Sequence, residues 1–126
     1  MYSHMMVGSN DLAKAKTFYD ATFGALGAAP GVFPMEDRVF YSHNDGMFVV
    51  ITPINGEPAC HANGGTIGIA MTSPEQIEAW HAAGVANGGT ACEDPPGVRD
   101  GAFGKMYLAY LRDPDGNKLC ALYRMG

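Results

Sequence analysis

The order of predicted elements occurs twice along this chain, and this repetition restricts the fold more than any other feature of the sequence. Residues 5–8 and 66–71 are short apolar runs that are typical of β-strands, and a helical pattern follows each of them. Hairpin patterns follow both helices. The two halves align at an offset of 62 residues, so that Ala15 falls on Ile77 and Phe18 falls on Trp80. This alignment predicts a duplicated β-α-β-β-β unit.

Residues that commonly cap helices mark the start of both predicted helices. Asn10 precedes the first helix, with Asp11 at its positive end, and Ser73 followed by Pro74 begins the second. Apolar residues at helical spacing give the first helix one buried stripe, and Gly24 suits its end. Module 1 is therefore expected to span residues of about 1–55 within a single domain. The expected linker is about 56–64 and module 2 is about 65–126.

Turn residues separate two pairs of predicted strands, which are Arg38–Ser42 with Met47–Thr52 and Lys105–Arg112 with Asn117–Tyr123. Asp-Gly at the first turn is a strong hairpin signal. Pro-Asp-Gly forms the second turn, so Asp113 and Asp115 are interpreted as turn residues rather than as catalytic carboxylates. Residues 24–34 are expected to be a loop or an irregular edge strand. Residues 95–104 are expected to be a glycine-containing loop and a candidate lid.

The composition is that of a globular protein with an acidic balance. The chain of 126 residues is 47% hydrophobic and 17% charged, and its formal net charge is −5. This charge, without a run of Lys or Arg, disfavours nucleic acid as a partner. No apolar run reaches the length of about 20 residues that a membrane span needs, and residues 1–4 do not resemble a secretion signal. The three cysteines are widely spaced, which predicts free thiols and a cytoplasmic protein.

Three motifs, in this order along the chain, resemble one superfamily. They are His4 seven residues before Asp11, a helix that carries Phe18-Tyr19 and Phe23-Gly24, and a terminal Asp-Pro-Asp-Gly-Asn hairpin. The chain resembles the vicinal oxygen chelate superfamily of glyoxalases, bleomycin-resistance proteins and extradiol dioxygenases. The resemblance implies an α+β fold of two β-α-β-β-β modules, with about eight strands in curved mixed sheets that form a cup, and helices outside. It also implies a homodimer, in which modules pair either within one chain or across the dimer.

The same resemblance implies a divalent-metal site in the cup, but this chain retains one of the four usual ligands. His4 matches the ligand on the first strand. Thr66 stands at the corresponding position in module 2, Cys120 stands where Glu is usual, and about Val50 occupies the remaining position. Threonine and valine are not useful ligands for zinc, nickel or iron, so we predict no bound metal or other cofactor. His4, Cys120 and His61 form an alternative zinc set only if the linker folds inward.

We therefore predict a protein that binds a small, largely apolar molecule in the cup without the usual metal. Its ligand-binding residues are predicted to be His4, Met6, Phe48, Val50, Thr66, Cys120 and Leu122, with His4, Thr66 and Cys120 converging on one cavity. The alternative is a lyase, isomerase or dioxygenase-type enzyme of the same superfamily, with an atypical metal site or with His4 as an acid–base group. A third hypothesis is a structural or regulatory domain that binds a protein partner.

Overall fold

Each half of the chain begins with a strand and a helix at the positions that the sequence predicts. The computed structural model describes residues 1–126. The first half contains β1 (Met5–Gly8), α1 (Leu12–Gly24), β2 (Val32–Met35), β3 (Arg38–His43) and β4 (Gly46–Ile51). The second half contains β5 (Ile67–Ala70), α2 (Pro74–Ala86), β6 (Thr90–Ala91), β7 (Gly97–Gly101), β8 (Gly104–Arg112) and β9 (Lys118–Arg124). Neither helix has the length and apolar character that a membrane span requires.

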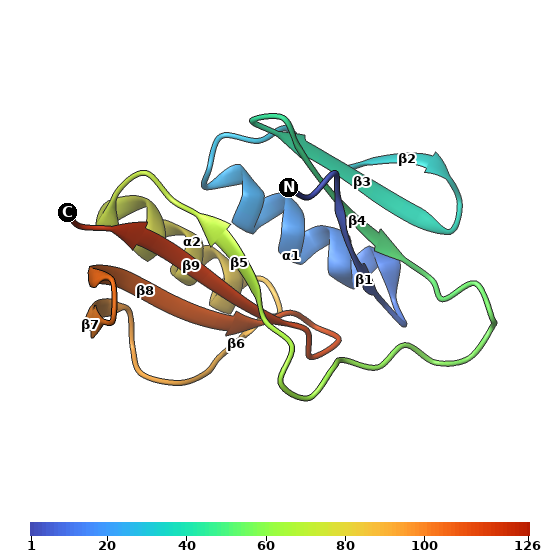
Figure 1. The fold of residues 1–126 in the computed structure, drawn as a ribbon. Helices are drawn as coiled ribbons and strands as arrows, with labels where there is room; N and C mark the ends of the chain where they lie inside the picture. Colours follow the sequence, from blue (N-terminus) through green and yellow to red (C-terminus); the bar gives the residue numbers. More distant parts are fainter.

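The strands form two mixed sheets, one from each half. Sheet A has the order β1-β4-β3-β2, and sheet B has the order β5-β9-β8-β6, with β7 also paired to β8. In both sheets the first strand runs parallel to the last strand of its module, and the other pairs are antiparallel. Both helices lie behind the sheets (Figure 1), and α1 packs against α2. The predicted α+β architecture of two modules is confirmed.

The structure has nine strands rather than about eight, because the segment before the closing hairpin is partly extended. Residues 97–101 form β7, which pairs with β8 through a turn at Ala102 and Phe103. The interpretation of residues 95–104 as a loop and lid was therefore wrong over most of its length. Glycines at both ends of β7 concealed the strand, since glycine is depleted in strands. Residues 32–35 form an edge strand. The sequence allowed either a loop or an irregular edge strand for residues 24–34.

The helix starts differ in how well the sequence predicted them. Ser73 caps α2 as expected, and its Oγ accepts a hydrogen bond from the Gln76 amide at 3.1 Å. The cap of α1 is Asp11 rather than Asn10, since the Lys14 amide donates to Asp11 Oδ1 at 3.1 Å. Asn10 instead holds the linker. Its Oδ1 accepts from the Ala59 amide at 2.7 Å, and its Nδ2 donates to the Ala59 carbonyl at 3.1 Å.

One hydrophobic core contains side chains of both helices and both sheets. Phe18 and Tyr19 on α1 and Ile77 and Trp80 on α2 are fully buried in it. Helix α2 approaches sheet B so closely at Gly84 that a Cβ there would lie 2.3 Å from Leu111 Cδ1. The two modules therefore share one contiguous hydrophobic core.

The closing Asp-Pro-Asp-Gly-Asn turn binds module 2 to module 1. The Tyr19 hydroxyl donates a hydrogen bond of 2.6 Å to Asp113 Oδ2. Asp113 is buried, with only 3% of its surface exposed. Asn117 Nδ2 donates to the Gly8 carbonyl at 3.1 Å, and the Asn10 amide donates to an Asp115 oxygen at 2.8 Å. The acidic residues are therefore turn residues, as predicted, and they also join the modules at the junction of β1 and α1.

The buried Tyr19 hydroxyl predicts a loss of stability in alkali. Burial, reinforced by the negative charge of Asp113, holds the pKa of Tyr19 well above its usual value of about 10. Since the folded pKa exceeds the unfolded one, the stabilisation is complete below about pH 10 and is lost as the pH rises further. Between pH 9 and pH 11 this tyrosine should lower the free energy of unfolding by up to about 1.4 kcal/mol, the limit that applies when only the unfolded state ionises.

Urea unfolding at both pH values tests this expectation in the wild type, in Tyr19→Phe and in Tyr2→Phe, whose side chain is exposed. Tyr19→Phe should reduce the alkaline loss and Tyr2→Phe should not. Equal pH dependence in all three proteins would show that Tyr19 ionises as easily in the folded state as in the unfolded state.

Candidate functional site

Side-chain alternation gives each sheet a helix-facing side and an open side. In sheet A, Met5 pairs with Phe48 and Val7 with Val50, and these side chains pack toward α1. The intervening pair of Met6 and Val49 faces the other way. We call this helix-free surface the open face. It is formed by Met6, Met47, Val49 and Ile51 of sheet A and by Leu108, Tyr110, Cys120 and Leu122 of sheet B.

Two of the predicted ligand-binding residues do not lie on this face. Val50 is fully buried in the core, and Phe48 is buried against the aromatic rings of α1. The residue of β4 beside Met6 is Val49, so the assignment of about Val50 to the family's ligand position was off by one residue. In a strand, such a slip moves every side chain to the opposite face.

The other predicted residues are divided among several surroundings. Met6, Cys120 and Leu122 belong to the open face, and Met6 is 42% exposed whereas Cys120 is 7% exposed. Met6 and Thr66 both line a cavity of about 330 Å³ between β1, β5 and the linker. His4 is exposed just before β1, and its Nδ1 shares a hydrogen bond of 2.7 Å with Ser3 Oγ.

No cavity of the single chain is lined by His4, Thr66 and Cys120 together. The expected convergence of these three residues is therefore not found within one chain. Cys120 lies on the open face of sheet B, whereas His4 precedes β1 at the edge of sheet A. The two sheets are not hydrogen-bonded to each other at β1 and β5, so no ladder fixes these side chains around a common point.

The residues at the family's metal positions do not fit a metal ion. Val49 offers no donor atom, and burial raises the pKa of the Cys120 thiol, which favours the protonated form that binds metals poorly. His61 packs against the closing turn, where a Cβ on Gly116 would lie 2.7 Å from His61 Nδ1. No three His, Cys, Asp or Glu side chains of the chain are grouped so as to hold a metal ion. The three cysteines form no disulfide.

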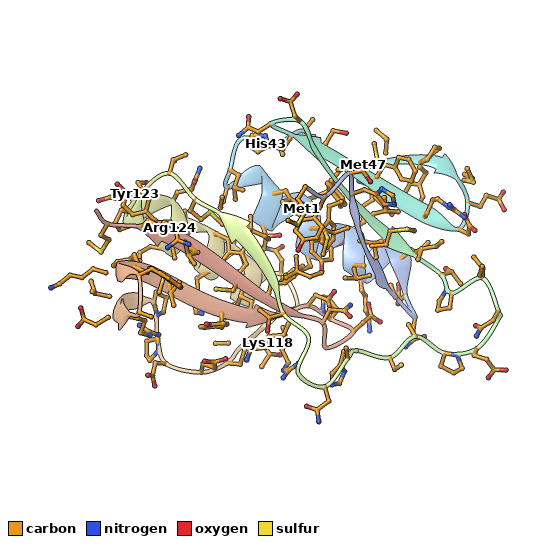
Figure 2. All side chains as sticks on the ribbon, viewed as in Figure 1. Met1, His43, Met47, Lys118, Tyr123 and Arg124 are labelled. Carbon is orange, nitrogen blue, oxygen red and sulfur yellow. The ribbon has the colours of Figure 1, made fainter.

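Sheet B adds positive charge to the apolar open face. Lys118 and Arg124 lie near the two ends of β9 (Figure 2). Arg99 of β7 is on the same side of the sheet, because Met106 of β8 pairs with both Arg99 and Arg124. Lys118 forms an ion pair with Glu93, and Arg99 Nη2 donates to two backbone carbonyls. Arg124 has no hydrogen-bond or ion-pair partner. The open face can therefore offer a free cation beside an apolar surface.

Tyr110 and Cys120 form a cross-strand pair between these charges. Burial, followed by the effect of Cys120, raises the pKa of Tyr110 to about 12. The Lys118 ammonium lies 5.0 Å from the centre of the Tyr110 ring. At neutral pH the pair is therefore uncharged, and it presents a hydroxyl and a thiol to whatever contacts this part of the face.

A β-α-β-β-β module and a β-α-β-β-β-β module, with a shared core and an open sheet face, define the class of this protein. The sequence matches the family model described as Glyoxalase/Bleomycin resistance protein/Dioxygenase superfamily over residues 2–121. Among solved structures it is similar to a glyoxalase/bleomycin resistance protein from Albidiferax ferrireducens, with 64% identity and a TM-score of 0.95, over 98% of this chain and 99% of that chain. The chain therefore belongs to the glyoxalase/bleomycin resistance protein/dioxygenase superfamily.

More distant structures share the fold alone. A glyoxalase-related enzyme from Fulvimarina pelagi has 19% identity and a TM-score of 0.74, over 98% of this chain and 88% of that chain. A lactoylglutathione lyase from Agrobacterium tumefaciens has 20% identity and a TM-score of 0.67, over 97% and 92% of the two chains. A search of curated proteins finds no match to this sequence.

Proposed function

We propose that this protein binds a small, largely apolar molecule on its open face, without the metal ion that the superfamily usually places there. The observation that carries the proposal is that Val49 and Cys120 on the open face, and Thr66 in the cavity that Met6 also lines, stand where the superfamily usually has metal ligands. Apolar surface with a few directed polar groups is what small-molecule sites generally use. His4, the Tyr110–Cys120 pair and Arg124 are the polar groups that would orient the ligand.

We further propose that a second copy of the chain completes the cup. The edge strands β1 and β5 have unpaired backbone on their outer sides, and Met6 and Met47 are exposed large hydrophobic side chains on the open face. A homodimer would cover both features. Light scattering should give twice the chain's mass of 13.3 kDa. A mass of one chain would restrict the ligand to the surface that a single chain offers.

Binding of 1-anilinonaphthalene-8-sulfonate tests the proposed site, since this dye combines apolar rings with one negative charge. We expect saturable binding that becomes at least about tenfold weaker in Leu122→Glu, because the new carboxylate lies on the open face and repels the sulfonate. Val85→Glu is the matched control, since Val85 is an exposed apolar residue of α2. Each variant is first checked for native fluorescence of the single tryptophan, Trp80, which is fully buried.

Equal weakening by both variants would mean that the added charge, and not its place, governs dye binding. An unchanged affinity in Leu122→Glu would contradict the open-face site.

Elemental mass spectrometry of the untagged protein should find well under one equivalent of zinc, nickel, manganese or iron. A full equivalent of metal that is lost in His4→Ala would overturn the metal-free part of the proposal.

A further inference from the structure

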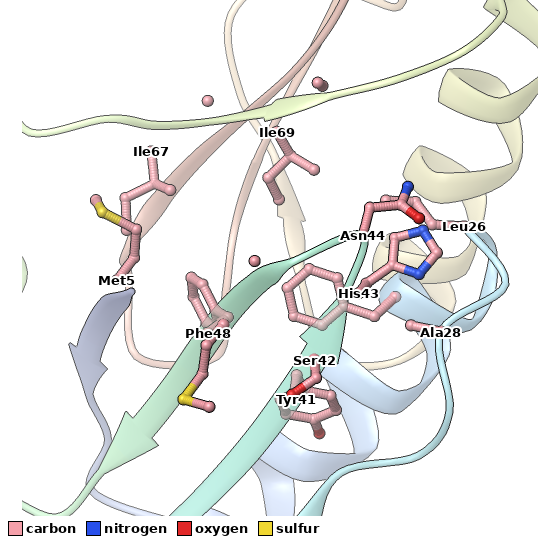
Figure 3. Close-up of a pocket in the computed structure, with 15 residues that line it drawn as sticks. Met5, Leu26, Ala28, Tyr41, Ser42, His43, Asn44, Phe48, Ile67 and Ile69 are labelled. Atoms are coloured by element: carbon pink, nitrogen blue, oxygen red, sulfur yellow. The ribbon is translucent and has the colours of Figure 1, made fainter. Parts of the chain in front are cut away.

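A second cavity lies between the modules, and most of its lining comes from the helix-facing side of the sheets. Of the open-face residues, only Met47 reaches it. Its volume is about 290 Å³. Met5, Phe23, Tyr41 and Phe48 form its wall in module 1, and β5 forms the opposite wall. Figure 3 shows Ile67 and Ile69 directed from β5 toward these residues. The cavity therefore exists only because the two modules are packed together.

The lining is apolar and aromatic over most of its area. Phe23, Tyr41 and Phe48 belong to one cluster of rings, with centroids 5.1 Å apart for Phe23 and Tyr41 and 5.3 Å apart for Phe23 and Phe48. Rings of this kind favour offset or edge-on contacts with another aromatic ring. Met5, on the same face as Phe48, adds a polarizable sulfur atom of the kind that contacts rings favourably.

Polar side chains gather at one end of the cavity only. Ser42, His43 and Asn44 come from the end of β3 and its turn, and their side chains make no hydrogen bond within the protein. Figure 3 shows His43 and Asn44 close together near Leu26 and Ala28. The turn that carries them is fixed by Asn44 and Asp45 in the left-handed region, with φ of 47° and 64°. These groups are free to bond to a ligand.

No charged side chain lines the cavity, although Asp, Glu, Lys and Arg make up 17% of the chain. An ionised ligand would therefore lose part of its hydration here without gaining a counter-charge, which is costly. A cavity of about 150 Å³ is sufficient for benzene, so the present volume is large enough for two fused rings. We propose that this cavity is a second small-molecule site, which takes a neutral one- or two-ring aromatic molecule with a single hydrogen-bonding group held by His43 and Asn44.

A ligand in this position contacts both modules at once. It adds contacts between β5 and sheet A, where no backbone ladder joins the two sheets. Binding to the folded state alone raises stability by mass action, so the ligand also raises the melting temperature. Occupancy of this site thus reinforces the arrangement of the modules on which the open face depends.

The five isoleucines allow a direct test by methyl NMR with 2-naphthol as the probe. Ile67 and Ile69 line the cavity, Ile51 lies on the open face, Ile54 is in the exposed linker and Ile77 is in the core. Saturable shifts of the Ile67 and Ile69 methyl signals, with the other three unchanged, are the expected result. Shifts at Ile51 instead would place the probe on the open face and overturn the proposal.

Two comparisons test the chemistry of the site. Ile69→Trp fills the cavity and should weaken 2-naphthol binding at least about tenfold, whereas Val98→Trp on the exposed side of β7 should not. If Ile69→Trp does not fold, His43→Ala should still weaken binding, because it removes one of the bonding groups.

Naphthalene-2-carboxylate, which has the same rings as 2-naphthol and a negative charge, should not bind. Equal binding of the two probes, or binding unaffected by Ile69→Trp and His43→Ala, would refute the assignment.

Discussion

Replacing Asp113 with alanine is expected to lower the free energy of unfolding by about 3–4 kcal/mol. The carboxylate accepts four hydrogen bonds, from the Tyr19 hydroxyl at 2.6 Å, Asn117 Nδ2 at 2.8 Å, and the amides of Asp115 and Asn117 at 2.9 Å each. Alanine leaves these donors without an acceptor in a buried place, and each unsatisfied group costs about 1–3 kcal/mol, partly recovered by relaxation. Since domains of this size are stable by about 5–15 kcal/mol, the loss is large.

Equilibrium unfolding in urea, followed by Trp80 fluorescence at one protein concentration, measures this effect. Asp100→Ala is the matched control, because Asp100 is exposed on β7 and makes no hydrogen bond through its side chain. Its cost should stay within about 0.5 kcal/mol. If Asp113→Ala were as stable as the control, the closing turn would not be what holds the modules together.

A double-mutant cycle with Tyr19→Phe locates the effect. Tyr19→Phe alone should cost about 1–2 kcal/mol, and the two changes together should cost less than their sum, because they remove one shared hydrogen bond. Strict additivity would show that Asp113 acts only within its own turn, through Asp115 and Asn117. The cycle therefore separates a turn residue from a residue that joins two modules.

Combining Thr66→His with Cys120→Glu is expected to create a metal site in the proposed homodimer, since a second copy is needed to bring these positions and His4 together. The two changes restore the residues that the superfamily usually has at these positions, and His4 supplies the third ligand. With nickel or zinc at about a hundred times the dissociation constant, the folded state gains about 2.7 kcal/mol. In a domain of this size the melting temperature should then rise by about 10 °C.

Calorimetry with and without metal, together with elemental analysis, measures the effect. Thr66→Asn with Cys120→Gln is the matched control, because it adds side chains of similar size that lack the imidazole and the carboxylate. Adding His4→Ala to the metal-binding variant should abolish the rise. The three positions share no cavity within one chain, so the result also tests whether a second copy brings them together. No metal uptake would mean that these positions do not meet in the native assembly.

The local signals of the sequence predicted both helices and the two main hairpins. Ser73 and Pro74 set the start of α2, and Gly24 ends α1, because caps depend on residues adjacent in the chain. The offset of 62 residues places β1 on β5 and α1 on α2 with the same boundaries. This part of the repeat has no insertion, so a sequence alignment was sufficient.

The later strands do not keep that offset. Met5 of β1 pairs with Phe48 of β4, and Ile67, its counterpart in β5, pairs with Leu119 of β9. Phe48 therefore corresponds to Leu119, which is an offset of 71 residues. The strands β6 and β7 lengthen module 2 between these points. For this reason Val49, and not Val50, corresponds to Cys120, and the sequence alone predicted the wrong face of β4.

The sequence by itself therefore determined both helices, the first strands, the main hairpins and the family, because these depend on local residue types and on spacing within each module. Only the tertiary structure decided which side chains meet. Strand register is set by hydrogen bonds between segments far apart in the chain, and a shift of one residue reverses the face. The bonding of Asp113 to Tyr19 and the cavity between Phe48 and Ile69 both arise from the packing of one module on the other, which no local pattern specifies.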